Sequence, residues 1–150
     1  MIKKPASLLW TLLAAALLFI WGNSLLPPSY SWKLSGMVQG VVEQVLPVEQ
    51  ADERLEQPKG FTVRKLAHMG EFALLGALLG LLTGAVRRCD RVPLALLLGL
   101  STALADETIQ RFTGRTSSVI DVWVDMGGFL FGLLLTWLVM RWRSSMPDGG

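Results

Sequence analysis

The chain has 150 residues, 51% of which are hydrophobic, and its formal net charge is only +2 at pH 7. Its mean hydropathy of +0.45 and its long apolar blocks exclude an ordinary small soluble domain. With so modest a net charge, we expect no nucleic-acid partner.

Four apolar blocks predict the fold class. A hydrocarbon core of about 30 Å requires about 20 helical residues at about 1.5 Å each. The blocks that approach this length are residues 6–26, 66–86, 92–112 and 119–140. They predict an all-α, multi-pass bundle of four transmembrane helices without a separate soluble domain.

The first segment, residues 1–26, is predicted to be a transmembrane helix, which Pro27 and Pro28 would end. Lys3 and Lys4 ahead of the apolar block also resemble the start of a secretory signal peptide. The block is long, however, and no small-x-small cleavage site precedes the two prolines. We therefore interpret this segment as a retained helix.

Residues 27–63 form the long connection and are predicted to be an outer loop. Between residues 32 and 46, apolar side chains recur with helical spacing on one face. They are Leu34, Met37, Val38, Val41, Val42 and Val45. This pattern predicts an amphipathic helix that lies in the membrane interface or caps the bundle.

Residues 64–140 are predicted to be a three-helix core, and residues 141–150 a cytoplasmic tail. Each core helix carries small residues at four-residue spacing, which lets helix backbones approach closely in lipid. These residues are Gly76, Gly80, Gly84, Ala95, Gly99, Ala103, Gly128 and Gly132. The short connections predict that the three helices are antiparallel neighbours, and the place of the first helix stays open.

Basic residues predict the orientation through their position rather than their number. Purely basic residues precede the first helix, and the tight turn at residues 87–91 holds little but positive charge. The positive-inside rule then predicts that both termini lie in the cytoplasm, and we expect the membrane to be a bacterial plasma membrane. The single cysteine, Cys89, lies in the same turn, so there is no disulfide framework.

In all three core helices, the apolar part is too short to cross the membrane. The charge-free parts are residues 72–86, 92–105 and 126–140, which span about 22 Å and fall about 8 Å short. The missing length lies at the same, outer end of each helix and is occupied by polar residues. The candidate ligand-binding residues there are Lys65, His68, Glu71, Asp106, Glu107, Gln110, Arg115, Asp121 and Asp125.

Two interpretations of these polar ends are open. Since each intramembrane charge costs at least about 2.5–3.5 kcal/mol, the carboxylates are expected to pair, to bind a cation or to line a wet cavity. In one interpretation, salt bridges with Arg64, Lys65, Arg111 and Arg115 merely join the helix ends. In the other, which we favour for the whole set, the residues form a functional pocket.

Two sequence motifs resemble those of VanZ-like membrane proteins. KLAHMGEF contains Lys65, His68 and Phe72, and resembles the family motif K-x-x-H followed by an aromatic residue. The second family motif is roughly D-E-x-x-Q-x-F-x-x-x-R, followed by D-x-x-x-N-x-x-G-x-x-x-G. The matching residues are Asp106, Glu107, Gln110, Phe112 and, in shifted register, Arg115, followed by Asp121, Gly128 and Gly132.

The resemblance covers well over half of the chain, with two departures. The usual asparagine of the second motif is Asp125 here, and a proline that often precedes the Gly-Arg pair is Thr113. The family is named for a protein that confers low-level resistance to teicoplanin, a glycopeptide antibiotic that acts on the cell envelope. The resemblance therefore implies a cell-envelope setting.

Two functions of different classes follow. In the first, the outer pocket binds a membrane lipid, a lipid-linked envelope precursor or a glycopeptide-type ligand, with arginine and lysine side chains holding anionic groups. In the alternative, the chain is a membrane-embedded enzyme that acts on a lipid-linked phosphate or sugar. His68 and Glu71 would then be the candidate acid/base residues, and a divalent metal would bind Asp106, Glu107, Asp121 and Asp125. The sequence contains no known hydrolase or transferase signature, and whether the chain forms a homo-oligomer stays open.

Overall fold

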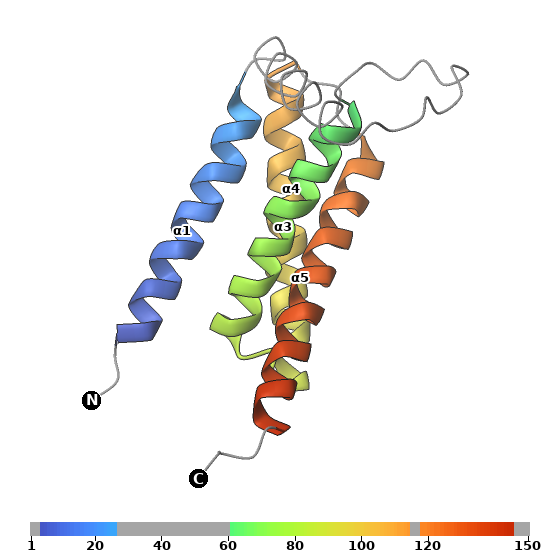
Figure 1. Ribbon diagram of the computed structural model, residues 1–150. Helices are drawn as coiled ribbons and strands as arrows, with labels where there is room; N and C mark the ends of the chain where they lie inside the picture. Colours follow the sequence, from blue (N-terminus) through green and yellow to red (C-terminus); the bar gives the residue numbers. More distant parts are fainter. Residues whose placement is uncertain (1–3, 27–60, 115–117, 146–150) are drawn as a thin grey trace, which may run out of the picture.

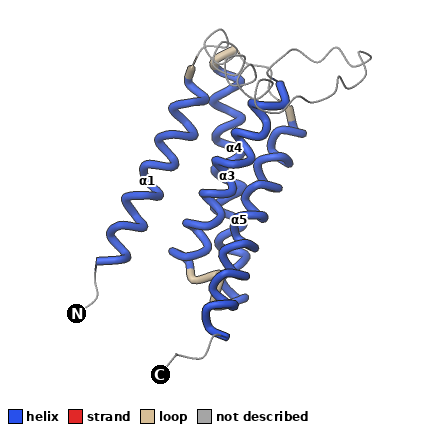
Figure 2. Tube along the Cα trace, in the orientation of Figure 1, coloured by secondary structure: helices blue, strands red, loops and turns tan. Residues whose placement is uncertain are grey.

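The computed structural model describes residues 4–26, 61–114 and 118–145, and the regular structure in these ranges is entirely helical (Figure 1, Figure 2). The elements are α1 (Lys4–Leu25), α3 (Phe61–Thr83), the short 3-10 helix η1 (Cys89–Arg91), α4 (Val92–Phe112) and α5 (Val119–Ser145). Four helices are long and apolar enough to cross a membrane. The predicted all-α bundle is therefore confirmed, whereas the amphipathic helix predicted at 32–46 lies outside the described residues.

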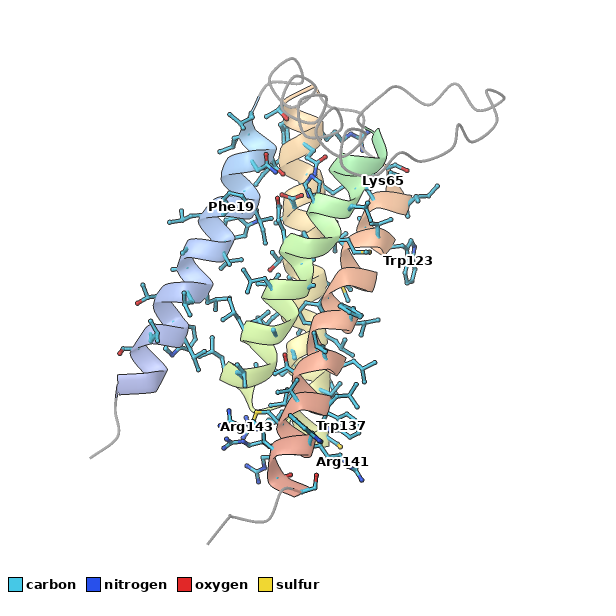
Figure 3. All side chains as sticks on the ribbon, viewed as in Figure 1. Phe19, Lys65, Trp123, Trp137, Arg141 and Arg143 are labelled. Atoms are coloured by element: carbon cyan, nitrogen blue, oxygen red, sulfur yellow. The ribbon has the colours of Figure 1, made fainter. Side chains whose placement is uncertain are left out.

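The two ends of the bundle differ chemically. At one end α1 begins, α5 finishes and α3 connects to α4 (Figure 1). We call this the arginine end, because its described exposed basic side chains are Arg87, Arg88, Arg91, Arg141 and Arg143, the last two of which are labelled in Figure 3. At the opposite end, where Lys65 lies, α1 and α4 finish and α3 and α5 begin (Figure 3). The predicted polar residues belong to this second end, which we call the carboxylate end.

The observed helix boundaries agree with the predicted ones in α4 and differ from them in α3. The observed range of α4 is the predicted one, and α5 extends past the predicted end at 140, with Arg141 stacked over the Trp137 ring at 5.2 Å. In contrast, α3 ends at Thr83, three residues before the predicted end at 86. Gly84 has a φ of +74°, a left-handed conformation that ends helices and that glycine adopts without strain. Gly84 therefore forms a turn and is not part of the packing stripe in which the sequence placed it.

The closest backbone contact joins α3 and α5, which run in the same direction. A methyl group added at Gly128 or Gly132 of α5 would overlap the backbone carbonyl of Met69 or Ala73 of α3. At Gly76 of α3, an added methyl group would overlap the backbone of α5. The short connections predicted that consecutive helices are antiparallel neighbours. They did not predict the contact between α3 and α5, which are parallel and not consecutive. The small-residue motifs nevertheless identified the surfaces that make it.

The third core helix, α4, packs on this pair through an aromatic side chain. Phe129 of α5 is fully buried, and its ring lies where a side chain at Gly99 of α4 would be. Ala95 and Ala103, one turn on either side of Gly99, are also fully buried. The predicted small-residue stripe of α4 thus accommodates a phenylalanine ring.

The first helix packs against the core through one narrow face. Leu13, Ala16, Ile20 and Ser24 are its buried residues, and they recur at helical spacing. In Figure 1, α1 diverges from α3 and α5 toward the arginine end. Its position, which the sequence left open, is thus fixed most firmly at the carboxylate end.

Candidate functional site

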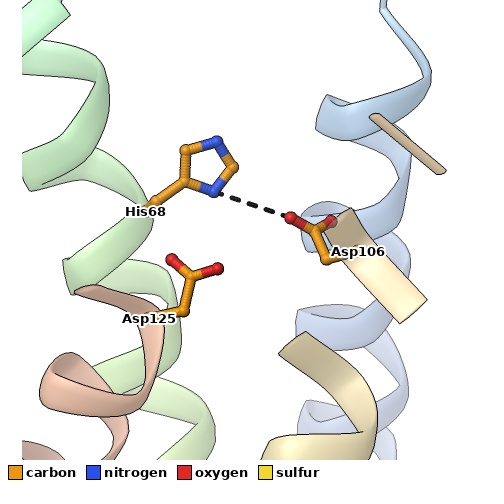
Figure 4. Close-up of side chains that lie close together, drawn as sticks. All are labelled: His68, Asp106 and Asp125. Atoms are coloured by element: carbon orange, nitrogen blue, oxygen red, sulfur yellow. Dashed lines mark ion pairs between the residues drawn. The ribbon is translucent and has the colours of Figure 1, made fainter. Parts of the chain in front are cut away.

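Three ionisable side chains from three helices converge at the carboxylate end. His68 of α3, Asp106 of α4 and Asp125 of α5 are all buried, and one ligand atom of each lies within 4.8 Å of the others. Figure 4 shows the three side chains pointing toward one another between the helices. Residues far apart in the sequence therefore form one cluster.

The helix packing explains why His68 and Asp125 meet. Asp125 lies three residues before Gly128, on the same face of α5, and Gly128 contacts the backbone at Met69. His68 is the residue before Met69. Because no side chain separates the two backbones here, the imidazole and the carboxyl group share the space directly above the glycine contact.

Asp106 is the most extensively bonded member of the cluster. It is fully buried, and both of its carboxylate oxygens accept hydrogen bonds. The Ser24 hydroxyl donates to Oδ1 at 2.5 Å, and the Gln110 amide nitrogen donates to Oδ2 at 2.7 Å. The His68 Nδ1 atom lies 3.9 Å from Oδ2 (Figure 4). Asp106 therefore links α1, α3 and α4 at one point.

A third acidic residue, Glu71, lies beside the imidazole. Its Oε2 atom is 3.7 Å from His68 Nδ1, and its Oε1 atom accepts a hydrogen bond from the Asn23 amide at 3.1 Å. The carboxylates of Glu71 and Asp106 thus both lie near the same ring nitrogen of His68. Glu71 is held in place by α1.

The amide oxygen of Gln110 gives independent evidence that the cluster can hold a ligand. The Gln110 side chain is 2% exposed, and its Oε1 atom accepts no hydrogen bond from the described residues. It lines a small cavity of about 10 Å³ together with Lys65, His68, Asp121, Val124 and Asp125. A cavity of this size holds about one water molecule or one bare ion.

The remaining predicted residues lie at the rim or elsewhere. Lys65 and Asp121 form an ion pair at 3.1 Å, and both are partly exposed. Glu107 is not one of the three converging residues and lines a separate pocket between α4 and α5 with Arg111 and Trp123. Arg115 and the side chain of Arg64 lie outside what the structure describes.

The predicted metal-ligand set changes accordingly. Of Asp106, Glu107, Asp121 and Asp125, only Asp106 and Asp125 belong to the converging group, and His68 joins them. Asp106 and Glu107 are neighbours on one helix and are separated by about 100° around its axis. Their side chains therefore leave the helix in different directions.

The sequence analysis missed the contribution of α1. Ser24 is fully buried against Asp106, and its backbone carbonyl accepts a hydrogen bond from the Thr113 hydroxyl at 3.2 Å. Asn23 and Ser24 are polar residues near the end of an otherwise apolar helix. Polar residues at the end of an apolar segment are the same pattern that identified the polar ends of the other three helices.

We expect Ser24→Ala to lower the free energy of unfolding by about 1–3 kcal/mol, because Asp106 would lose a buried donor. Unfolding of the purified protein by denaturing detergent measures the change. Ser101→Ala is the control, since the Ser101 hydroxyl is exposed and donates to the Leu97 carbonyl of its own helix. Equal effects of the two substitutions would contradict the role assigned to Ser24.

Comparison with known proteins identifies the family of the chain. Searches of the curated proteins and of the solved structures give no match. The profile of the VanZ/LLP1 family matches residues 9–140, a range that includes most of α1 and α5 and the whole of α3 and α4. The chain is therefore a multi-pass membrane protein that belongs to the VanZ/LLP1 family.

Proposed function

We propose that the chain binds an anionic component of the cell envelope at its carboxylate end, through a divalent cation held by His68, Asp106 and Asp125. The observation that carries this proposal is the convergence of three buried ligand-type atoms within 4.8 Å, each from a different helix. We further propose that the arginine end faces the cytoplasm of a bacterial plasma membrane, so that the site faces outward.

The balance of charge favours a cation. Among the described side chains, Glu71, Asp106, Asp121 and Asp125 gather near one basic residue, Lys65, which is paired with Asp121. Such a group repels a phosphate or a carboxylate. A bound divalent cation offsets this repulsion and supplies the positive charge that an anionic ligand requires.

The donor atoms favour a divalent cation that accepts nitrogen and oxygen ligands. An imidazole nitrogen and two carboxylates suit ions such as Mn²⁺ and Zn²⁺, and Gln110 Oε1 offers a fourth donor. Glu71 Oε2 lies 3.7 Å from the same Nδ1 atom that faces Asp106, so it adds negative charge beside the proposed cation.

The size of the cavity limits what enters the site. A volume of about 10 Å³ admits an ion but no phosphate or sugar. The anionic ligand therefore binds above the cation, at the partly exposed rim where Lys65 lies. A lipid-linked phosphate meets these requirements, since its head group can reach the rim while its hydrocarbon chain stays in the membrane.

The alternative function is a metal-assisted enzyme that acts on the same class of lipid. The contact between His68 Nδ1 and Glu71 at 3.7 Å favours it, because a histidine–carboxylate pair can transfer protons. A role in teicoplanin resistance, which the family name suggests, would follow from either function if the antibiotic or its target binds at the rim.

Binding of a short-chain polyprenyl phosphate to the protein in nanodiscs tests the proposal. We expect binding with Mn²⁺ present, and at least about tenfold weaker binding after chelation, the effect of losing roughly 1.4 kcal/mol. The matched polyprenol, which has no phosphate, should bind weakly in both conditions. Binding that does not change on chelation would contradict the proposal, and release of inorganic phosphate would favour the enzyme.

A further inference from the structure

We propose that a groove between α1, α3 and α4 binds one hydrocarbon chain of an anionic phospholipid, whose phosphate contacts Arg91 at the arginine end. This second site is separate from the carboxylate cluster and does not depend on its function. The groove has a volume of about 560 Å³. Its lining is mostly apolar and includes Leu13, Leu17, Leu79 and Leu98.

The shape of the groove follows from the way α1 is attached. Along α1 the groove extends from Trp10 to Trp21, and along α4 from Arg91 to Thr102, about 16 Å in each case. The groove is elongated and mostly apolar, so it suits an extended hydrocarbon chain that runs along α1 and α4.

The polar groups of the lining favour hydrocarbon over a polar ligand. The hydroxyl groups of Thr83, Ser101 and Thr102 donate to carbonyls of their own helices at 2.6, 2.8 and 2.9 Å. The hydroxyl protons of these three side chains are therefore already donated and are not offered to a polar ligand. The Trp21 indole N–H, at the opposite end of the groove from Arg91, has no acceptor among the described residues.

Charge complementarity identifies the head group. Arg91 is the one charged residue among the described residues of the lining, and Arg87 and Arg88 lie in the same connection. Arg91 contacts Asp90 only at 3.8 Å, and both side chains are about half exposed or more. A guanidinium group at the membrane surface suits a phosphate. The lipid chain would then enter where α1 diverges from the core (Figure 1).

Native mass spectrometry of the full chain, with added phosphatidylglycerol or phosphatidylcholine, tests this inference. We expect one phosphatidylglycerol to remain bound, with about tenfold preference over phosphatidylcholine, equivalent to roughly one charge-assisted contact. Arg91→Gln should remove the preference. Arg88→Gln is the matched control, because Arg88 is exposed, lies outside the groove and is also near Asp90. This variant should keep the preference for phosphatidylglycerol.

A second pair of variants tests the groove itself. Leu98→Trp should fill the groove and release the lipid, whereas Leu97→Trp, next to it but outside the lining, should not. Equal retention of both lipids, equal effects within either pair, or a dimer that Leu98→Trp disrupts would overturn the inference. If Leu98→Trp does not fold, the arginine pair decides the result.

Discussion

Asp106→Asn is expected to weaken divalent cation binding by more than about 100-fold, since outer-shell partners of a metal alone contribute about 10–100-fold. The substitution keeps the size of the side chain but removes a charged ligand at the centre of the site. Asp106 is fully buried and lies within reach of both His68 and Asp125. Isothermal titration with Mn²⁺ measures the affinity directly.

The neighbouring acidic residue provides the control. Glu107 lines a different pocket, so Glu107→Gln should leave the Mn²⁺ affinity unchanged. Thermal unfolding gives a second readout, because a ligand at 100 times its Kd stabilises a protein by about 2.7 kcal/mol. Mn²⁺ should stabilise the wild type and Glu107→Gln but not Asp106→Asn. The same loss in both variants would mean that Glu107 also belongs to the site.

Gly132→Leu is expected to lower the free energy of unfolding by more than about 3 kcal/mol, because adding even one or two methylene groups to a packed site costs about 1–3 kcal/mol. The first added atom would already overlap the Ala73 carbonyl of α3. Since the α3–α5 contact also brings His68 to Asp125, the affinity for Mn²⁺ should fall as well. Unfolding by denaturing detergent and titration with Mn²⁺ measure the two effects.

Another glycine of the same helix is the matched control. Gly127 is exposed, and no atom lies within 4 Å of a side chain built there. Gly127→Leu should therefore be neutral or slightly stabilising, since leucine is the better helix former. If both leucine substitutions destabilise the protein equally, the close α3–α5 packing is not what holds the bundle together.

The same division between the two ends supports the orientation proposed above. Five of the described side chains at the arginine end are exposed and basic, and the carboxylate cluster lies at the opposite end. We propose on this basis that the cation site faces away from the cytoplasm, where it meets envelope components rather than cytosolic nucleotides.

The sequence predicted the fold because each helix is specified locally. Four apolar blocks of nearly membrane-spanning length predict four helices, and α4 has the predicted boundaries. The end of α3 was predicted too late because Gly84 fits both a packing stripe and a left-handed turn. The sequence could not distinguish these roles, since glycine serves both.

The site was predicted in outline but not in detail. Ionisable residues at the same end of three short helices indicated a polar cluster, and His68, Asp106 and Asp125 do converge. The sequence did not show which of Asp106 and Glu107 belongs to the cluster, because each continues a stripe of small or polar residues on α4. Only the position of α5 shows which face is turned inward.

The contribution of α1 could not be predicted from spacing. A connection as long as residues 27–60 places no geometric limit on where the first helix lies. Ser24 therefore gave no sign of its distant partner Asp106, 82 residues further along the chain. Its contact depends on tertiary packing alone.

Pulsed electron paramagnetic resonance of bound Mn²⁺ tests the central claim most directly, because His68 is the single histidine of the chain. We predict one Mn²⁺ per chain, with a nitrogen coupling from a directly bound imidazole that disappears in His68→Gln. Mn²⁺ bound without this coupling, or no stoichiometric Mn²⁺ at all, would contradict the proposed site.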